Sequence, residues 1–455
     1  MKLNELFENV PDIEIRSLMA DSRKKRPSSI FFCIKGIMSD GHKFIDQAIT
    51  NGAIVIVYSE PLEKMYKGIT YIRVENVIHT FNQVADAFYN YPSHHLKMYG
   101  VTGTNGKSSI ACIIRNILNP LMPCGYIGTI SIEYGNVKLP PLLTTPDIDD
   151  LHGILKDMVD AGMHACALEA SSMGIEQGRV EAIDFDVAIF TNLTHDHLDY
   201  HGTMERYFQA KKKLFDSLKE DAIAVTNMDD PHGMAIVEDT AAKVVTYGTK
   251  EGADYQIVNY QLLKDRTRIT LKISNMLYEI ETNLVAKFNI YNLVAAIAAL
   301  HSSGVSIEQM LPTIKSLHQI EGRMERIDEE QPFNIIVDFG HTPDGIEQVC
   351  KYASAITPKG KRIISITGSA GKRDTEKRPI FGEILDKYSD MIILTEDDPR
   401  DEDPIEIAKE IATGIKNTNY ILIEDRYDAI RQAVELADPE DTIVILGKGD
   451  EKFIY

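Results

Sequence analysis

A short glycine-rich segment carries the strongest chemical signal in the chain. Residues 99–109 read Tyr-Gly-Val-Thr-Gly-Thr-Asn-Gly-Lys-Ser-Ser, and an apolar run at 110–114 follows directly. This order predicts a buried strand, a tight loop and a helix that starts at the loop. Glycines let backbone N–H groups converge on an anion, and the helix N-terminus and Lys107 add positive charge. Ser108 is placed to bind a Mg²⁺ that bridges phosphates. The segment therefore predicts a nucleotide-phosphate site made by Gly103, Thr104, Asn105, Gly106, Lys107, Ser108 and Ser109.

The segment departs from the usual phosphate loop at one position. That loop has a glycine five residues before its Gly-Lys pair, where this chain has Val101. A chance Gly-Lys-Ser turn is the alternative interpretation. The apolar strand before the loop and the helix after it favour the phosphate site.

Further chemistry-bearing residues follow other apolar runs. Glu169 closes the run 164–168, where it could be a Mg²⁺ ligand or a helix-capping acid. Residues 194–201 contain three histidines and two aspartates, which suit a metal site or a surface loop. Both lie where parallel sheets bind ligands, at the carboxyl ends of strands, and this favours function. Lysines 211–213 lie on a predicted helix, and their spacing alone is typical of a solvated face.

Several other polar residues are weak signals individually. The segment 144–147 could cap a helix, and Arg179 and Arg323 could be surface charges. Asp338 ends a predicted strand. The segment 397–400 also follows an apolar strand, where it could bind an anion or an amine.

An acidic chain of 455 residues must position these groups. Its net charge of −20 makes nucleic acid a poor partner, so local positive groups must attract any anionic ligand. No apolar run reaches the ~20 residues of a membrane span, and the first eight residues are too polar for a secretory signal. The five cysteines form no C-x-x-C pair, which predicts reduced thiols in a cytoplasmic protein without a zinc site: Cys33, Cys112, Cys124, Cys166 and Cys350.

Length and apolar patterning predict an α/β protein of about three domains. A breaker cluster at 91–95 separates an N-terminal domain, 1–96, from a central domain, 97–325, and a new alternation marks a C-terminal domain, 326–455. The central domain predicts a mostly parallel sheet, with antiparallel strands in 255–282. The expected strands are 29–34, 53–58, 163–170, 185–192, 222–227, 242–247, 334–338, 362–367, 391–395, 421–424 and 442–446, and the expected helices include 43–51, 148–161, 204–218 and 293–301.

Taken together, these residues resemble the Mur ligase family from Asp21-Ser22-Arg23 to Gly447-Lys448-Gly449. The short loop at 102–107 is that family's own form of phosphate loop, which accounts for the missing glycine. The most specific matches are residues 192–204 and 144–146. The resemblance implies a three-domain architecture, with a central P-loop-type domain of mostly parallel sheet and a C-terminal Rossmann-like α/β domain.

The resemblance also implies roles on the nucleotide side. Lys107 and Ser108 would hold the phosphates of ATP and a Mg²⁺, with Glu169 as a metal ligand. His197 and Lys211 would hold a second Mg²⁺, Lys211 through the carboxylate that it gains on carbamylation by CO₂. The nucleotide site would be completed by Asn289 and Asn292 on the adenine side and by Arg323 and Asp338 at the phosphate and ribose.

The remaining matches imply contacts to the other substrates. Ser22 would lie near a uridine diphosphate. The muramyl dipeptide would contact Thr144, Thr145, Ser171, Gln177 and Arg179, and the incoming amino acid would contact Arg373, Asp397, Arg400, Gly447 and Glu451.

The implied activity is an ATP-dependent ligation in peptidoglycan synthesis. The γ-phosphoryl group of ATP would pass to the D-glutamate carboxylate of UDP-N-acetylmuramyl-L-Ala-D-Glu, and a diamino acid would attack the resulting acyl phosphate. Two Mg²⁺ ions and Lys107 would offset the repulsion between the carboxylate and ATP. We expect a cytoplasmic monomer that neither inserts into a membrane nor binds nucleic acid.

Four positions depart from the family pattern without removing a phosphate or metal group. Met173 replaces a histidine, Gly340 an alanine, Ala286 a glycine and Asp450 a histidine.

A fifth departure bears on the amine. The family motif Asp-Asn-Pro-Arg accompanies meso-diaminopimelate, whose distal carboxylate Arg400 can bind with two hydrogen bonds. Here Asp398 replaces the asparagine, and an added carboxylate could instead favour the distal ammonium of L-lysine. We favour diaminopimelate and keep L-lysine as the alternative.

Two other functions stay open. A paralogue could join a different carboxylate and amine outside main wall synthesis, and a nonligating regulatory subunit could merely bind ATP. The four intact residues Lys107, Glu169, His197 and Lys211 argue against the second, because a scaffold has no need for all of them.

Overall fold

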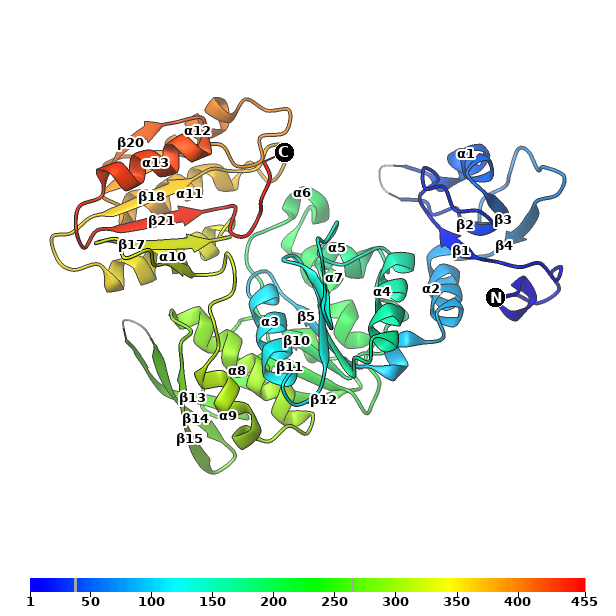
Figure 1. Cartoon of the computed structure of the whole chain (residues 1–455), viewed down its shortest axis with the longest axis horizontal. Helices are drawn as coiled ribbons and strands as arrows, with labels where there is room; N and C mark the ends of the chain where they lie inside the picture. The colour runs from blue at the N-terminus through cyan, green and yellow to red at the C-terminus, as the bar shows by residue number, and fades with distance from the viewer. Residues whose placement is uncertain (37–38, 264–265, 455) are drawn as a thin grey trace. The chain divides into compact units, whose positions relative to one another are not determined.

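The structure, a computed structural model, describes residues 1–36, 39–263 and 266–454 (Figure 1). The chain divides into two compact units. The first contains residues 1–98 and 122–185, and the second contains residues 99–121 and 186–455. Both units have the α/β composition that the sequence predicts.

The first unit begins with a parallel sheet in the order β1-β2-β3-β4. All four residues of the central strand β2 are buried, because α1 packs on one face of this sheet and α2 on the other. The predicted strands 29–34 and 53–58 are confirmed, and the predicted helix 43–51 is confirmed as α1. The bounds are β1 Ser17–Met19, β2 Ser29–Phe32, α1 Ile45–Thr50, β3 Ala53–Tyr58, β4 Thr70–Arg73 and α2 Val77–Phe88.

The same unit contains a second group of strands, in which β6 pairs with β9 in parallel and with β7 antiparallel. Glu169 is the last residue of β9, and every residue of that strand is buried. The expected strand 163–170 and helix 148–161 are therefore confirmed. The bounds are β6 Cys124–Ile127, β7 Ile132–Tyr134, β8 Val137–Leu139, α4 Ile148–Asp160, β9 Ala165–Glu169 and α5 Ser172–Glu176.

In the second unit, strands β10, β11, β12 and β13 continue in parallel from β5, and β14 and β15 add an antiparallel edge. This arrangement confirms both the parallel and the antiparallel expectations, although residues 264–265 lie outside the described residues. The strands are β5 Lys97–Thr102, β10 Val187–Phe190, β11 Ile223–Asn227, β12 Lys243–Gly248, β13 Tyr255–Leu262, β14 Thr267–Ile273 and β15 Met276–Thr282. The helices are α3 Lys107–Leu118, α6 Leu198–His201, α7 Met204–Asp216, α8 Lys287–Ser302 and α9 Ile307–Lys315.

The second unit also contains a sheet in the order β16-β17-β21-β18-β19-β20, parallel except at β16. Apolar residues of α10, α11 and α12 pack on one face, and those of α13 pack on the other. This is the doubly wound, Rossmann-like arrangement that the resemblance implies. The bounds are β16 Glu325–Ile327, β17 Asn334–Asp338, α10 Pro343–Ile356, β18 Ile363–Thr367, α11 Lys377–Tyr388, β19 Met391–Leu394, α12 Pro404–Ala412, β20 Asn419–Leu422, α13 Arg426–Leu436 and β21 Thr442–Leu446.

Strand β20 differs from the expectation of 421–424. It begins at Asn419 because it pairs in parallel with β19, with Met391 opposite Asn419 and Leu394 opposite Leu422. Asn419 and Tyr420 are exposed at this sheet edge, so the apolar pattern did not include them.

Ala286 shows a structural effect of one departure from the family pattern. This residue has φ 73° and ψ 148°, and it is 1% exposed at the start of α8. Such a conformation is nearly exclusive to glycine and costs an alanine about 1–3 kcal/mol.

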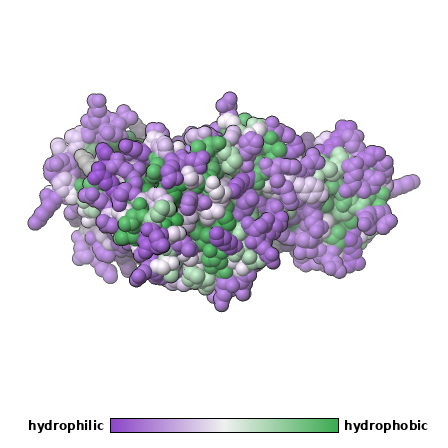
Figure 2. Space-filling model, turned by 90° about the horizontal axis from the view of Figure 1, so that it is seen from below, coloured by the Kyte–Doolittle hydropathy of each residue, from purple (hydrophilic) through white to green (hydrophobic). Residues whose placement is uncertain are grey.

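Hydrophilic side chains cover most of the face seen in Figure 2, with apolar patches among them. Among the described residues, no helix is both long enough and apolar enough to cross a membrane. All five cysteines are free thiols.

Candidate active site

The phosphate loop joins β5 to α3 and requires its glycines. Gly103 and Gly106 have φ values of 149° and 90°, a region that favours glycine. A Cβ atom at Gly103 would lie 1.8 Å from the hydroxyl of Thr191, and one at Gly106 would lie 2.6 Å from the Asn292 side-chain oxygen. The backbone N–H of Asn105 donates to the Asn192 side chain at 3.0 Å. The loop is therefore held between β10 and α8.

Two lysines converge on this loop. The Lys107 ammonium donates to the carbonyls of Gly103 and Thr104, at 3.0 and 2.8 Å. Lys211 reaches the same Gly103 carbonyl from α7, at 2.9 Å, and its Nζ lies 4.4 Å from the centre of the Tyr207 ring. Lys211 is 1% exposed, and burial, aided by the charge of Lys107, lowers its pKa well below the ordinary lysine value. The lowered pKa favours the unprotonated amine, which is the nucleophilic form.

Asp196 of the histidine-rich segment lies among basic side chains. Its carboxylate is 3.3 Å from His197 Nε2, 3.8 Å from His341 Nε2 and 3.9 Å from Lys377 Nζ. Burial acts to raise the pKa of Asp196, but these basic neighbours and Lys107 outweigh it and bring the pKa to about 2. Desolvation lowers the pKa of His197 to about 3, so His197 presents a neutral imidazole, the form that binds metals.

The same segment contacts the C-terminal part of the second unit. His195 Nε2 lies 2.7 Å from Asp374, and the guanidinium of Arg373 lies 3.9 Å from Asp199. Arg373, predicted to receive the amino acid, is exposed and faces this acid.

The phosphate loop makes its own contact with the same C-terminal part. Asn105 donates to Asp344 and accepts from Thr342, both at 3.2 Å. Thr342 is the N-cap of α10, and Asp344 lies in that helix's first turn.

The predicted nucleotide-side residues fall into two groups. Asn292 donates to Asn289 at 3.1 Å, and the Asn292 oxygen packs against Gly106 of the phosphate loop. Arg323 instead bonds Asp450 at 2.8 Å and lies 4.2 Å from the centre of the Phe339 ring.

Asp338 belongs to this second group. It accepts from the backbone N–H groups of Met324 and Gly340, at 2.8 and 2.7 Å. Burial raises its pKa. The carboxylate is thus fixed beside the turn that carries Arg323.

In the first unit, Glu169 is fully buried and tightly held. Its carboxylate accepts from the Tyr126 hydroxyl at 2.7 Å and from the Thr129 N–H and hydroxyl at 2.9 and 3.2 Å. The Thr129 hydroxyl lies 3.1 Å from that of Thr144, and Thr145 donates to the Glu169 carbonyl at 2.7 Å. Glu169 therefore belongs to the same network as two predicted substrate residues.

The other predicted dipeptide residues join this network. The Thr145 hydroxyl lies 3.0 Å from the hydroxyl of Ser171. Arg179 donates to the Thr145 carbonyl at 2.8 Å and to the Gln177 side chain at 2.6 Å. Ser22 lies outside the network, where it donates to Gln47 at 2.8 Å.

The predicted amino-acid residues are only partly brought together. Asp397 and Glu451 both lie around Lys448, and a Cβ atom at Gly447 would lie 2.3 Å from the Asp397 carboxylate. Arg400 is exposed, with a backbone φ of 55°.

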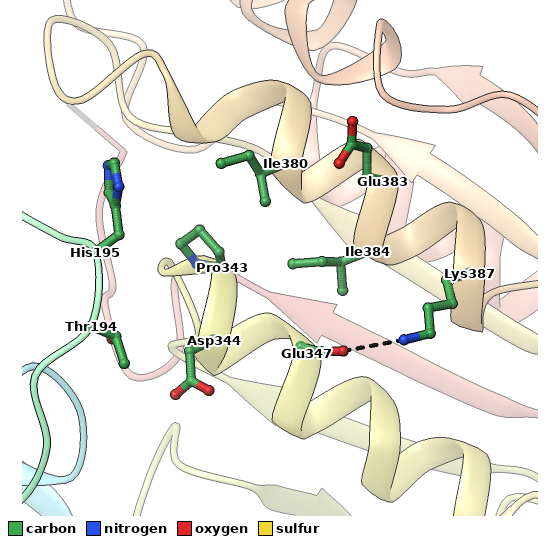
Figure 3. A pocket seen from close by; sticks show the side chains of 9 residues that line it. All are labelled: Thr194, His195, Pro343, Asp344, Glu347, Ile380, Glu383, Ile384 and Lys387. Carbon is green, nitrogen blue, oxygen red and sulfur yellow. Dashed lines mark hydrogen bonds and ion pairs between the residues drawn. The ribbon is translucent and has the colours of Figure 1, made fainter. Parts of the chain in front are cut away.

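A cavity of about 490 Å³ opens between the histidine-rich segment and helices α10 and α11 (Figure 3). Apolar Pro343, Ile380 and Ile384 line it, and an ion pair of 3.4 Å joins Glu347 and Lys387 at one side. Its lining includes Thr194 and His195 of the histidine-rich segment, but none of the residues to which the resemblance assigns nucleotide, metal or substrate.

Several residues of these networks were not predicted. Tyr126 and Thr129 hold Glu169, but the first reads as an ordinary core residue of an apolar strand. Lys377 lies 181 residues along the chain from Asp196, which it faces, so no local pattern points to it. Lys448 had a signal, because it lies between Gly447 and Gly449 directly after an apolar strand.

A glycine loop connects the parallel strand β5 to the start of α3, and the same unit contains a doubly wound sheet. These features define the class of P-loop-type α/β proteins. Family models match three segments of the chain: the Mur ligase family catalytic domain at residues 14–89, the Mur ligase middle domain at 101–300, and the Mur ligase glutamate ligase domain at 322–449. The chain belongs to the Mur ligase family.

Curated relatives match along nearly the whole chain. A UDP-N-acetylmuramoyl-L-alanyl-D-glutamate–2,6-diaminopimelate ligase of Halalkalibacterium halodurans is 39% identical over 452 residues, which cover 98% of this chain and 92% of the relative. One of Clostridium acetobutylicum is 39% identical, covering 100% and 95%. A solved structure of an enzyme with the same name has a TM-score of 0.71 at 30% identity, covering 99% and 93%.

Proposed function

We propose that this chain is an ATP-dependent ligase that joins the D-glutamate γ-carboxylate of UDP-N-acetylmuramyl-L-Ala-D-Glu to meso-diaminopimelate in peptidoglycan synthesis. The observation that carries the proposal is the meeting of Lys107 and the buried Lys211 at one phosphate-loop carbonyl. The names of the relatives at 39% identity support the substrates. We further propose that the enzyme acts as a monomer in the cytoplasm.

Positive charge at the phosphate loop makes the first step possible. ATP and the substrate carboxylate are both anions, and the chain as a whole carries a charge of −20. The N-terminus of α3, the loop N–H groups and Lys107 would bind the phosphates and stabilise the charge that develops on them. The carboxylate oxygen then attacks the γ-phosphorus, ADP leaves, and an acyl phosphate forms.

The second step needs a neutral amine and a dry site. The amine attacks the acyl carbon, inorganic phosphate leaves, and the ammonium nitrogen loses its proton on the way to the amide. Water competes for the acyl phosphate, so the reaction requires a site that excludes water. Asn105, which bonds both Thr342 and Asp344, offers one contact between the phosphate loop and the C-terminal part of the same unit.

The residues present fit the two Mg²⁺ ions of this chemistry. Ser108 and Glu169 supply the oxygen atoms that Mg²⁺ prefers, and His197 is neutral. Lys211 fits carbamylation because burial lowers the pKa of its amine and so favours the unprotonated form, which adds CO₂ to give a carboxylate and a released proton. We propose Ser108 and Glu169 as Mg²⁺ ligands, and His197 and carbamylated Lys211 as ligands of a second ion. The ions would neutralise phosphate charge when bound.

We propose three domains with separate tasks. Residues 1–96 would bind the uridine diphosphate end through Ser22, residues 97–325 would bind ATP, and residues 326–455 would bind the amine. The three family matches, at 14–89, 101–300 and 322–449, support this division. The network of Glu169, Thr144 and Thr145 supports a dipeptide site beside the metal ligand.

Phosphate release tests the proposal. The protein is mixed with ATP, Mg²⁺ and UDP-N-acetylmuramyl-L-Ala-D-Glu, with and without meso-diaminopimelate. We expect release that depends on both the dipeptide nucleotide and the amine. Phosphate release that depends on neither the amine nor the dipeptide nucleotide would refute the ligase function. Release when a different acid replaces the dipeptide nucleotide would indicate a paralogue.

A further inference from the structure

Helix α2 of the first unit buries a polar side chain beside its apolar face. The apolar face packs on the sheet β1–β4 through Val77, Phe81, Val84 and Ala85. Asn82 lies on an adjoining side of the helix and is only 1% exposed. A buried side-chain amide needs hydrogen-bond partners, so the groups that it contacts indicate what it holds in place.

The Asn82 amide holds both ends of a turn at residues 178–182. Its nitrogen donates to the Gly178 carbonyl at 2.8 Å and to the Ile78 carbonyl of its own helix at 3.0 Å. Its oxygen accepts from the Ala182 N–H at 3.3 Å. Because one side chain contacts the start and the end of the turn, it fixes the backbone between them.

The helix also approaches this turn very closely. Gly178 has a φ of 69°, and a Cβ atom on it would lie 2.6 Å from the Ile78 side chain. At the exposed side of the same contact, the His79 ring forms a hydrogen bond with the Glu181 carboxylate. The turn therefore follows the position of α2.

Arg179 is the residue that the turn carries toward the proposed dipeptide site. Its guanidinium donates to the Thr145 carbonyl at 2.8 Å and to the Gln177 side chain at 2.6 Å, and it lies 3.3 Å from the Asp147 carboxylate. The Arg179 side chain is 15% exposed. A shift of the turn would therefore shift a guanidinium that faces the substrate.

The apolar face of α2 connects this turn to the other end of the same substrate. The sheet under that face carries Ser22 in the connection between β1 and β2, and Ser22 is proposed to contact the uridine diphosphate end. Contacts for both ends of the dipeptide nucleotide are thus placed by one helix. A fixed spacing between them reduces the cost of ordering the site when the substrate binds.

We propose that Asn82 is a positioning residue for the dipeptide nucleotide, because its amide holds the turn that presents Arg179. This inference rests on the proposed function, since it takes Arg179 as a contact of the dipeptide. Asn82 acts through the arginine and not by touching the substrate. Its loss is therefore expected to weaken binding of the dipeptide nucleotide without weakening binding of ATP or the amine.

Two substitutions of Asn82 test the proposal. Asn82→Ala removes all three hydrogen bonds. Asn82→Ser is the milder change, because a serine hydroxyl can still bond the Ile78 carbonyl in its own helix but is too short to reach the turn. In both variants we expect the KM for UDP-N-acetylmuramyl-L-Ala-D-Glu to rise about tenfold, as loss of a substrate hydrogen bond does. The KM values for ATP and meso-diaminopimelate, measured by the same phosphate release, are expected to stay unchanged.

Ser93→Ala is the matched control for lost stability. The Ser93 hydroxyl accepts from the Asp184 N–H at 3.2 Å, beyond the turn in the same segment, and Ser93 is also 1% exposed. This variant is expected to lower the thermal midpoint and to leave all three KM values unchanged.

A double-mutant cycle tests whether Asn82 acts through Arg179. Arg179→Ala alone is expected to raise the KM for the dipeptide nucleotide. If the turn matters only because it presents this arginine, then Asn82→Ala added to Arg179→Ala raises that KM no further, so the two effects are not additive.

Each result has one meaning. An unchanged KM for the dipeptide nucleotide in both Asn82 variants would overturn the role of Asn82. An equal rise in Ser93→Ala, or additive effects in the double variant, would also overturn it, because the change would then reflect stability or a route that bypasses Arg179. Absence of phosphate release that depends on the dipeptide nucleotide in the wild type would instead refute the proposed function.

Discussion

Truncation of Lys211 to alanine is expected to remove most ligase activity and to make the activity dependent on an added small carboxylate. Loss of the proposed metal ligand is expected to lower kcat about 100-fold, which corresponds to ~2.7 kcal/mol of transition-state stabilisation. Loss of residues that hold a metal ligand in place typically costs about 10- to 100-fold, so the upper end of that range is expected for a ligand itself. An added acetate ion can occupy the space of the missing side chain and supply the carboxylate.

The structure also sets the cost in stability. Lys211 is 1% exposed, so truncation of its four-carbon stem is comparable to truncation of a buried methionine, at about 2–5 kcal/mol. Relief of the burial of its amine offsets part of that cost. Lys211→Met keeps the volume of the side chain and is expected to lose less than about 1.5 kcal/mol. It removes the amine but leaves no space for a free carboxylate.

The assay compares these two variants. Amine-dependent phosphate release is followed over a range of sodium acetate concentrations, with sodium chloride at equal ionic strength as the control. Acetate is expected to restore activity to Lys211→Ala and not to Lys211→Met. Full activity in either variant without acetate would refute the role of Lys211. Equal rescue of both variants would show that acetate acts elsewhere.

Three other predictions concern strain, substrate affinity and pH. Ala286→Gly relieves a backbone strain of about 1–3 kcal/mol, but the extra freedom of glycine in the unfolded chain costs about 0.5–1 kcal/mol. Thermal unfolding is therefore expected to show a free energy of unfolding about 1 kcal/mol higher than that of the wild type. A lower free energy of unfolding would contradict the strain. Arg400→Ala is expected to raise the KM for the amine about tenfold, as loss of a charged hydrogen bond does, with little change in the KM for ATP; equal changes in steady-state kinetics would argue against that role. Burial acts to raise the pKa of Asp441, but hydrogen bonds from Arg362 and Asp438 outweigh it and lower the pKa. The resulting stabilisation is present above the ordinary carboxyl pKa of about 4 and is lost as the pH falls below it. Asp441→Asn is therefore expected to lose less thermal stability than the wild type between pH 6 and pH 3. Identical losses would exclude the Arg362–Asp441 pair as a source of acid sensitivity.

Much of the fold was predictable because apolar periodicity records burial directly. Strands such as β2 and β9 are buried along their whole length, and both were expected from their unbroken apolar runs. The predicted bounds of the edge strand β20 were wrong because pairing with β19, rather than burial, decides where the strand begins.

The site was predictable only where local order carries the chemistry. The phosphate loop is continuous in sequence, so its glycines, lysine and hydroxyls could be assigned from their spacing. The roles of the three lysines on α7 could not be assigned in this way, because each lysine lies in different surroundings. Lys211 is buried at the phosphate loop, Lys212 pairs with Asp216 and Asp239, and Lys213 is exposed. The interpretation of a solvated face was wrong for the first two. Which member of such a run faces the ligand depends on tertiary packing, which spacing does not encode.

The Asn105 amide ties the phosphate loop to the first turn of α10 through one acceptor and one donor bond. A ligand that shifts the phosphate loop would therefore also shift the start of α10, which packs on another sheet. An environment-sensitive dye attached near that helix start would change its emission as ATP is added, and Asn105→Ala would uncouple the signal from the titration. A dye placed there would thus report nucleotide binding through the Asn105 contacts without requiring the enzyme to turn over.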